Sequence, residues 1–190
     1  MITVPARIGA GLDGPPGEAV EVDLVDAERS PHRVEVVRHR GRAVEVARRP
    51  ELVRARLDGA DLSGARVTAD LTGASLVGAS IADANLGADM RNQSMGLMRA
   101  VLKSANLERL NARGADLSRV DLEFSSLKDA DLTGASLKRA QLGGADLTGV
   151  TVIDTDFDGA DLASTRLIAP IGLDQAKNFD KARNSDRLIR

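Results

Sequence analysis

Residues 105–167 read ANLER LNARG ADLSR VDLEF SSLKD ADLTG ASLKR AQLGG ADLTG VTVID TDFDG ADLAS TRL. An apolar residue occupies every fifth position from Leu107 to Leu167, and a small residue, usually Ala, lies two positions before each of them except Ala112, which Leu110 precedes. A helix repeats its apolar face every ~3.6 residues and a strand repeats its face every 2, so a period of five indicates neither. A fixed short repeat of this kind indicates units that stack on one another and bury a shared core.

The motif A(D/N)L(S/T)x in this stretch resembles the motif of the pentapeptide-repeat family. Residues 60–64, 130–134 and 145–149 match it fully. The resemblance implies an all-β fold, a right-handed quadrilateral β-helix with one pentapeptide per side and four per coil. We therefore expect the apolar residue and the small residue before it to point inward, and roughly 5–6 coils in which residue n lies over residue n+20.

The inward positions provide a test of this geometry. Leu110 and Ala112 exchange the large and small positions while keeping the enclosed volume, which cores tolerate well. The prediction also requires Leu117, Leu137 and Phe157 to lie one above another along the axis.

The repeat divides the chain into three parts. Residues 1–51 lack it and contain alternating apolar and polar residues at 20–24, 34–36 and 44–46, which predict a β-rich segment that caps the first coil or forms a small subdomain. Residues 52–168 form the β-helix, with a four-residue step from Val67 to Leu71 and a loss of register near residues 87–96. This irregular segment could be a loop or a bulge.

Residues 169–190 follow the last pentapeptide. Leu173, Ala176, Phe179 and Ala182 recur every three residues. This spacing predicts a short amphipathic helix that caps the β-helix, followed by a basic tail.

Composition narrows the function classes. The 190-residue chain has a formal net charge of −2, so no strong attraction to nucleic acid or to a membrane surface is implied. It contains no Cys, which excludes disulfides and Cys-based metal sites. We expect no cofactor, no signal peptide and no membrane span. We also expect the protein to lie in the cytoplasm, and the family resemblance implies a bacterial cell.

Catalytic motifs are weak. Residues 9–14 match GxGxxG, but Pro15 and Pro16 follow where a dinucleotide site needs a helix. Residues 125–128 match SxxK, but Ser125 is expected to point inward and Lys128 outward. We therefore predict that the protein is not an enzyme.

Aspartates dominate the position before the central apolar residue and form a possible acidic face. Within the pentapeptide-repeat family, the quinolone-resistance subgroup resembles duplex DNA and binds DNA gyrase, so the resemblance implies the same role for an acidic face here. Two observations weigh against this: Ser136 and Gln141 interrupt the aspartate columns, and the net charge is small. A solvated surface is the simpler interpretation. The residues of this possible acidic face are Asp116, Asp121, Asp131, Asp146, Asp156, Asp158 and Asp161.

Other outward residues are candidates for partner contact. Arg91, Asn92 and Gln93 lie in the irregular segment, where exposed polar side chains on a rigid scaffold often make contacts, although the nearby Met residues could simply fill an irregular coil. Phe124 is outward and could either contact a partner or pack on a neighbouring coil.

Outward charges become neighbours when one coil lies over the next. Lys138 over Asp158 would pair opposite charges, and such surface pairs add a few tenths of a kcal/mol each. Arg119 over Arg139 places like charges in successive coils, so the expected ladder of charges is not perfect.

These observations favour a non-catalytic rigid scaffold that binds a protein partner through its β-helix surface. The alternative is a DNA-mimicking binder of DNA gyrase or another topoisomerase, of the quinolone- or toxin-resistance type. Direct nucleic-acid binding is not expected, and the sequence leaves open whether the chain is a monomer or a homodimer.

Overall fold

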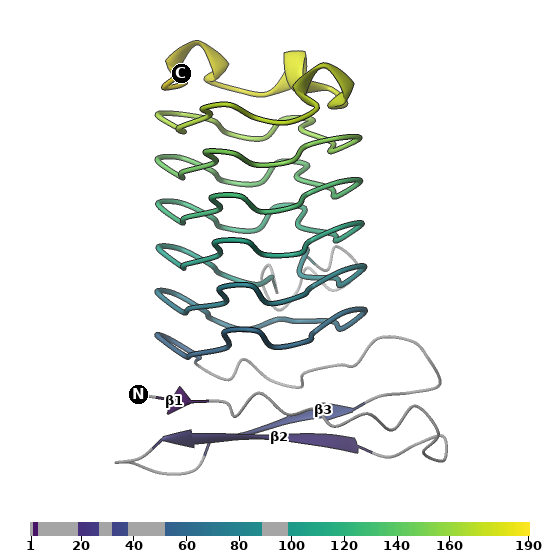
Figure 1. Ribbon diagram of the computed structural model, residues 1–190, viewed down its shortest axis with the longest axis vertical. Coiled ribbons are helices and arrows are strands. Elements are labelled where there is room, and N and C mark those ends of the chain that lie inside the picture. The colour runs from purple at the N-terminus through teal and green to yellow at the C-terminus, as the bar shows by residue number, and fades with distance from the viewer. Residues whose placement is uncertain (1, 4–18, 27–31, 38–51, 89–98) are drawn as a thin grey trace, which may run out of the picture.

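The computed structural model describes residues 2–3, 19–26, 32–37, 52–88 and 99–190 of the chain. In Figure 1, stacked coils form an upright rod, with β-strands drawn at the N-terminal end and short helices at the C-terminal end. The rod comes from the pentapeptide region of the sequence.

The N-terminal strands form one antiparallel sheet in the order β1-β2-β3. They are β1 (Ile2–Thr3), β2 (Ala19–Asp26) and β3 (His32–Val37), and β2 pairs with β3 from Ala19↔Val37 to Leu24↔His32. The strands expected at 20–24 and 34–36 are confirmed, and the one expected at 44–46 lies outside the described residues. β1 was not predicted, because two residues are too few to show an alternating pattern.

Single-residue parallel bridges join each coil to the next. The bridging residue is the one before each central apolar residue. For bridging residues from Val101 to Thr151 the next partner lies 20 positions further on, as in Asp116↔Ser136 and Ser136↔Asp156. The bridges form four columns, which we call sides A to D. Side A contains Asn106, Ser126, Asp146 and Arg166; side B contains Asn111, Asp131, Thr151 and Ile171; side C contains Asp116, Ser136, Asp156 and Lys177; side D contains Val101, Asp121, Gln141, Asp161 and Arg183.

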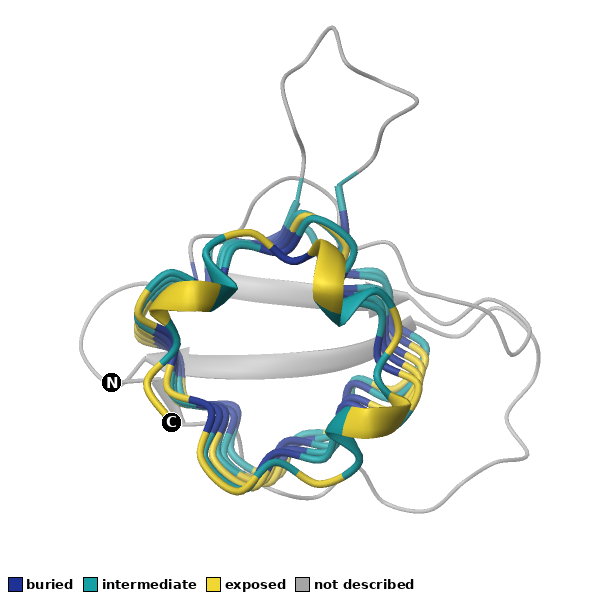
Figure 2. Ribbon diagram, turned by 90° about the horizontal axis from the view of Figure 1, so that it is seen from above, coloured by how far each residue is buried: buried dark blue, intermediate teal, exposed yellow. Residues whose placement is uncertain are grey.

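The core is the column of inward residues that the five-residue period predicts. Leu117, Leu137 and Phe157 follow successive bridge residues of side C and are all buried, so the predicted alignment is confirmed. Leu110 and Ala112, with large and small positions exchanged, are also both buried. Figure 2 shows the buried positions repeating in register when the rod is viewed along its axis.

Each regular corner between two sides is a tight turn of two residues. In the turn after Leu132, the Ala135 amide donates to the Leu132 carbonyl oxygen at 2.9 Å, and Gly134 adopts φ 69°. Left-handed φ suits Gly because L side chains are strained there, which explains the Gly that ends many of the pentapeptides.

Charged side chains pair between coils, but mostly along diagonals. Lys103 and Glu123 pair at 2.8 Å, as expected for one coil lying directly over the next. Lys138 instead pairs with Asp156 at 3.2 Å, and Lys128 with Asp146 at 3.6 Å. The expected pairing of Lys138 with Asp158 is thus replaced, because the aspartate at the bridge position of the next coil accepts the ammonium group.

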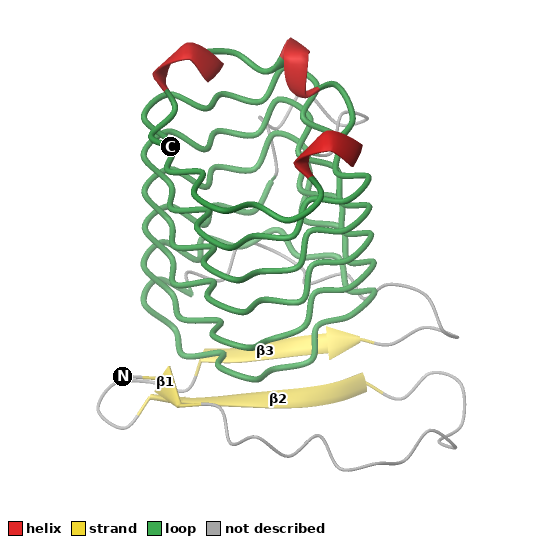
Figure 3. Cartoon of the chain, turned by 45° about the horizontal axis from the view of Figure 1, so that its top comes forward, coloured by secondary structure: helices red, strands yellow, loops and turns green. Residues whose placement is uncertain are grey.

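The C-terminal segment does not form the expected single capping helix. It contains three separate 3-10 helices at successive corners: η2 (Leu173–Gln175), η3 (Phe179–Lys181) and η4 (Ser185–Arg187) (Figure 3). The bridge residues that follow these helices, Lys177, Arg183 and Ile189, are six apart. The segment therefore adds a coil with six-residue sides, and the expected contact of Phe179 with the end of the core is made by an edge-to-face packing on Phe157, with ring centroids 5.3 Å apart.

Candidate interaction surface

One corner of the β-helix carries both irregularities of the repeat. The first coil is one residue short at this corner, because the step from Val67 to Leu71 is four residues. Arg66, just before this step, still bridges Asn85 in the next coil. In the second coil Asn85 bridges Asp116, and these two partners lie much further apart along the chain than the partners of a regular coil. The second coil therefore contains an insertion at this corner. We call this corner, which lies between sides C and D, the insertion corner.

The insertion leaves the bridge pattern intact. The Ala100 amide donates to the Leu86 carbonyl oxygen at 3.0 Å, which is the same bond that closes the two-residue corners elsewhere. The extra residues of the irregular segment near residues 87–96 therefore fall within one corner, and the chain resumes the stack at Ala100. The choice between a loop and a bulge concerns residues outside the described ranges. Insertions in repeat proteins gather on one face, which is often the binding face.

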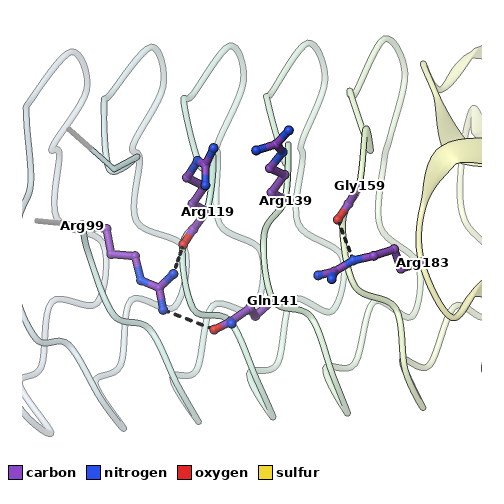
Figure 4. Close-up of a pocket in the computed structure, with 6 residues that line it drawn as sticks. All are labelled: Arg99, Arg119, Arg139, Gln141, Gly159 and Arg183. Carbon is purple, nitrogen blue, oxygen red and sulfur yellow. Dashed lines mark hydrogen bonds between the residues drawn. The ribbon is translucent and has the colours of Figure 1, made fainter. Parts of the chain in front are cut away.

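An open groove follows the insertion corner along the rod. It has a volume of about 420 Å³ and is lined by Arg99, Arg119, Arg139, Gln141, Gly159 and Arg183 (Figure 4). Four of these six residues are arginines and none is acidic. We call it the arginine groove.

Two of the four arginines are fixed to the backbone. Arg99, immediately after the insertion, donates from Nη1 to the Arg119 carbonyl oxygen at 2.7 Å and from Nη2 to Gln141 Oε1 at 3.2 Å. At the other end of the groove, Arg183 donates from Nε to the Gly159 carbonyl oxygen at 3.2 Å and lies 3.7 Å from a carboxylate oxygen of Asp161. Both guanidinium groups are thereby held in place at the two ends of the arginine groove.

The guanidinium groups of the other two arginines have no partner among the described residues. Arg119 and Arg139 occupy the same corner position in successive coils, with φ 62° and 55°. Figure 4 shows their side chains lying side by side and extending in the same direction. Two adjacent cations without counter-charges create a local positive potential on a chain whose overall charge is slightly negative.

The aspartates of the possible acidic face do not gather on one face. Asp146 lies on side A, Asp131 on side B, Asp116 and Asp156 on side C, and Asp121 and Asp161 on side D. Asp158 lies beside Gly159 at the insertion corner. Ser136 and Gln141 interrupt sides C and D, as the sequence indicated.

Aspartates at the bridge position have a structural role. An Oδ1 atom of Asp116, Asp131 and Asp146 accepts the backbone N–H two residues further on, at 2.9, 2.9 and 3.0 Å respectively. Such Asx turns stabilise the corner and explain why the motif favours Asp or Asn at this position. Outward position alone therefore does not make these carboxylates a binding site.

Two of these carboxyl groups illustrate the electrostatics. Partial burial raises the pKa of Asp131, but hydrogen bonds from Thr133 and Arg113 outweigh it, so the pKa is below its usual value. Partial burial likewise raises the pKa of Asp146, and hydrogen bonds from Thr148 with the charges of Lys128 and Arg166 lower it overall. Both groups are therefore held in the charged form at neutral pH.

Phe124 lies at a different corner, between sides D and A. Its side chain is 61% exposed, and the Lys103 ammonium group lies 5.5 Å from the ring centroid. The ring also covers Gly144 of the next coil, because a Cβ added there would be 2.6 Å from a ring carbon. Phe124 therefore packs on the neighbouring coil, as one of the two alternatives for this residue expected. The other candidates for partner contact, Arg91, Asn92 and Gln93, lie outside the described residues.

The sequence interpretation missed the arginine groove. The regular spacing of Arg99, Arg119 and Arg139 was the available signal, but the stacking of Arg119 over Arg139 was treated as a local electrostatic defect. Among the residues that the structure describes, no group of three or more His, Cys, Asp or Glu side chains is arranged to hold a metal ion. No helix in these same ranges is long and apolar enough to cross a membrane.

The stacked four-sided coils and their Asx-turn corners define a β-helix built from five-residue sides. The profile of the family described as pentapeptide repeats matches residues 51–92, 97–134 and 125–163 in eight copies, which is more than half of the chain. The chain belongs to the pentapeptide-repeat family, whose solved members imply the right-handed form of the β-helix.

Solved structures show the same relationship. HetL, a pentapeptide-repeat protein involved in heterocyst differentiation regulation in the cyanobacterium Nostoc, is 28% identical over 78% of this chain, with a TM-score of 0.56. The similarity covers 66% of the length of HetL, slightly less than two thirds.

Two further structures are less similar. Rfr23, a pentapeptide-repeat protein from the cyanobacterium Cyanothece, is 22% identical over 60% of this chain and 63% of its own, with a TM-score of 0.38. QnrB1, a plasmid-mediated fluoroquinolone resistance protein, is 19% identical over 66% of this chain and 64% of its own, with a TM-score of 0.33. A comparison with characterised protein sequences gave no significant match.

Proposed function

We propose that this protein is a non-catalytic scaffold of the cytoplasm that binds a protein partner at the insertion corner. The observation that carries the proposal is the pair Arg119 and Arg139, whose guanidinium groups have no partner in the described part of the chain. They lie on a rigid stack of coils beside the insertion. Unpaired Arg side chains on a preorganised surface are frequent anchors at protein interfaces.

A binding role also suits the way the fold uses its polar residues. The aspartates at the bridge positions hold corner turns, and many of them accept additional hydrogen bonds or ion pairs, as Asp156 does from Asn178 and Lys138. These side chains stabilise the scaffold. The rigid stack then presents the groove without a large ordering cost on binding.

The alternative of a gyrase-binding DNA mimic has less support. It requires a continuous acidic surface, whereas the aspartates are distributed over four sides and the arginine groove adds positive charge along one corner. A gyrase supercoiling assay with and without a fluoroquinolone tests it directly. We expect neither inhibition nor protection at micromolar protein, and either effect would favour the alternative.

The proposed function is tested by affinity capture with the intact chain. Bait carrying Arg119→Ala and Arg139→Ala is compared with wild type and with a matched control, Arg54→Ala and Arg109→Ala, which removes the same charge from other corners. We expect specific partners of the wild type to be lost with the first variant and kept with the control. Equal capture by all three baits would refute the insertion corner as the binding surface.

A further inference from the structure

We propose that the arginine groove binds the carboxylate side chains of a short acidic segment of a partner protein. The inference rests on the proposed function and gives the partner its chemistry. Its starting point is the composition of the groove: four arginines, Gln141 and Gly159, with no acidic residue among those that line it.

The spacing of the free cations suits neighbouring anions. Arg119 and Arg139 lie one coil apart, because the bridges Asp116↔Ser136 and Asp121↔Gln141 join the two coils on either side of the corner. One coil corresponds to about 4.8 Å along the axis. Two guanidinium groups at this spacing can share one carboxylate or hold two carboxylates from nearby side chains. The planar fork of Arg matches a carboxylate with two parallel hydrogen bonds.

The two fixed arginines add donors that need no further ordering. A guanidinium group has five N–H donors. Arg99 donates two hydrogen bonds, to the Arg119 carbonyl and to Gln141. Arg183 donates to the Gly159 carbonyl and forms an ion pair with Asp161. Donors therefore remain on both residues, and their positions are set before a ligand arrives, which reduces the entropy lost on binding.

Two substitutions in the repeat keep the groove open and reduce the negative charge beside it. On side D, Gln141 lies between Asp121 and Asp161 in the column of bridge residues. Arg99 therefore meets the neutral amide of Gln141 at a position where the neighbouring coils have a carboxylate. At the corner, Gly159 takes the position that Arg119 and Arg139 hold in the two coils before it, and a Cβ added there would be 3.3 Å from Arg139 Cγ. The resulting volume of about 420 Å³ is within the range of small-ligand sites, which leaves room for more than one carboxylate group.

The surroundings favour an acidic peptide over a nucleic acid. A nucleic-acid backbone carries closely spaced charges along its whole length and needs an extended basic surface. Here Asp116 and Asp156 lie on side C, Asp121 lies on side D and Asp158 adjoins Gly159, so a long polyanion would meet carboxylates on both flanks of the groove. A short segment with two or three acidic side chains can place them on Arg119 and Arg139 without extending to those flanking aspartates.

Fluorescence anisotropy with the full chain tests this inference. The probe is a labelled peptide of alternating Gly and Glu, compared with a Gly and Gln peptide and with a labelled DNA duplex. We expect the Glu peptide to bind more tightly than either of the others, and added salt to weaken it. Equal or tighter binding of the duplex would overturn the acidic-peptide assignment, and so would failure of the Glu peptide to bind.

Variants locate the binding. Arg119→Gln with Arg139→Gln should weaken binding of the Glu peptide at least about tenfold, because charge-assisted hydrogen bonds are lost. Arg54→Gln with Arg109→Gln makes the same charge change at left-handed positions of two other corners, with φ 59° and 56°, and should have little effect. Equal weakening by both pairs would show non-specific attraction and overturn the inference. If affinity capture depends on the insertion corner but the Glu peptide does not bind, the proposed function stands and the acidic segment is wrong.

Discussion

The amide of Ala100 donates to the carbonyl oxygen of Leu86 at 3.0 Å, although residues 87–99 lie between them. In the regular coils that follow, from Leu102 to Thr165, this bond encloses two corner residues, as it does between Leu132 and Ala135. The stack of coils therefore passes the insertion without a change in its hydrogen bonds.

Deletion of residues 88–98 should leave a folded β-helix. The junction becomes Ala84-Asn85-Leu86-Gly87-Arg99, which has the same pattern as Ala105-Asn106-Leu107-Glu108-Arg109. We expect an unchanged or slightly higher melting temperature, because fewer residues have to be closed between Leu86 and Ala100. Thermal unfolding followed by circular dichroism measures it. A variant that fails to fold would show that the insertion is part of the core.

Glycines at the corners provide a second prediction. Gly134→Ala should destabilise the protein by about 1 kcal/mol, since φ is 69° while a Cβ would approach no atom more closely than 3.9 Å. Gly144→Ala should cost more, because its Cβ would also lie 2.6 Å from the Phe124 ring.

Gly143→Ala is the matched control for these two glycines. Its φ is not left-handed and its nearest contact would be an ordinary 3.7 Å. Chemical denaturation should therefore rank the losses in free energy of unfolding as Gly144, Gly134 and Gly143. A loss at Gly143 equal to that at Gly134 would contradict the left-handed corner.

The core provides a third prediction. Leu132 has no exposed surface, so Leu132→Ala should cost about 2–5 kcal/mol and Leu132→Asp should unfold the rod by burying an unpaired charge. Ser136→Asp should be tolerated, because the side chain lies on the outer surface, where its hydroxyl contacts Ser118 at 2.8 Å. Circular dichroism and gel filtration distinguish these outcomes, and a soluble, cooperatively folded Leu132→Asp variant would be incompatible with the assigned core.

The pH dependence follows from the lowered pKa values of Asp131 and Asp146. Their charged forms contribute stability that is present above the unfolded pKa of about 3.9 and is lost as pH falls through the folded pKa. We expect the melting temperature to change little between pH 7 and 5 and to fall below about pH 4.

Asp131→Asn is the variant for this pH test. Its amide oxygen can still accept the Thr133 N–H bond, but the side chain no longer titrates. The variant should show a shallower acid transition than wild type. An identical acid transition would mean that Asp131 does not contribute.

Much of the architecture could be predicted from the sequence. The period of five placed Leu117, Leu137 and Phe157 in one column, because a single large residue per side is all that the narrow interior accommodates. The four-residue step after Val67 also marked a true deletion. These features depend only on neighbouring coils, so the local repeat contains the information.

The C-terminal coil was misread because its period is six. Residues 173–178, 179–184 and 185–190 read LDQAKN, FDKARN and SDRLIR, with aspartates at Asp174, Asp180 and Asp186. The apolar residues of this repeat fall three apart and imitate a helical face. The repeated Asp was the signal that could have separated the two interpretations.

The five-residue repeat indicates the column of Arg99, Arg119 and Arg139, but it does not indicate the complete arginine groove. Arg99 reaches it because the insertion ends beside Arg119, and Arg183 reaches it because six-residue sides shift it to a position over Asp161. Strict continuation of the regular coil would have placed Arg183 over Ala163. The two ends of the groove therefore depend on the insertion and on the six-residue sides, which the folded chain brings to one corner.

The widening of the final coil bears on the length of the rod. The sequence separation of its bridging partners grows by one at each successive side, from Thr151↔Ile171 through Asp156↔Lys177 and Asp161↔Arg183 to Arg166↔Ile189. Its perimeter therefore no longer matches a five-residue winding. An incoming coil of regular pentapeptides, from this chain or from another copy, would fall out of step within one circuit. A coil of five-residue sides stacked on residues 171–189 would therefore have mismatched strand edges, so this wider coil disfavours edge-to-edge joining of regular coils.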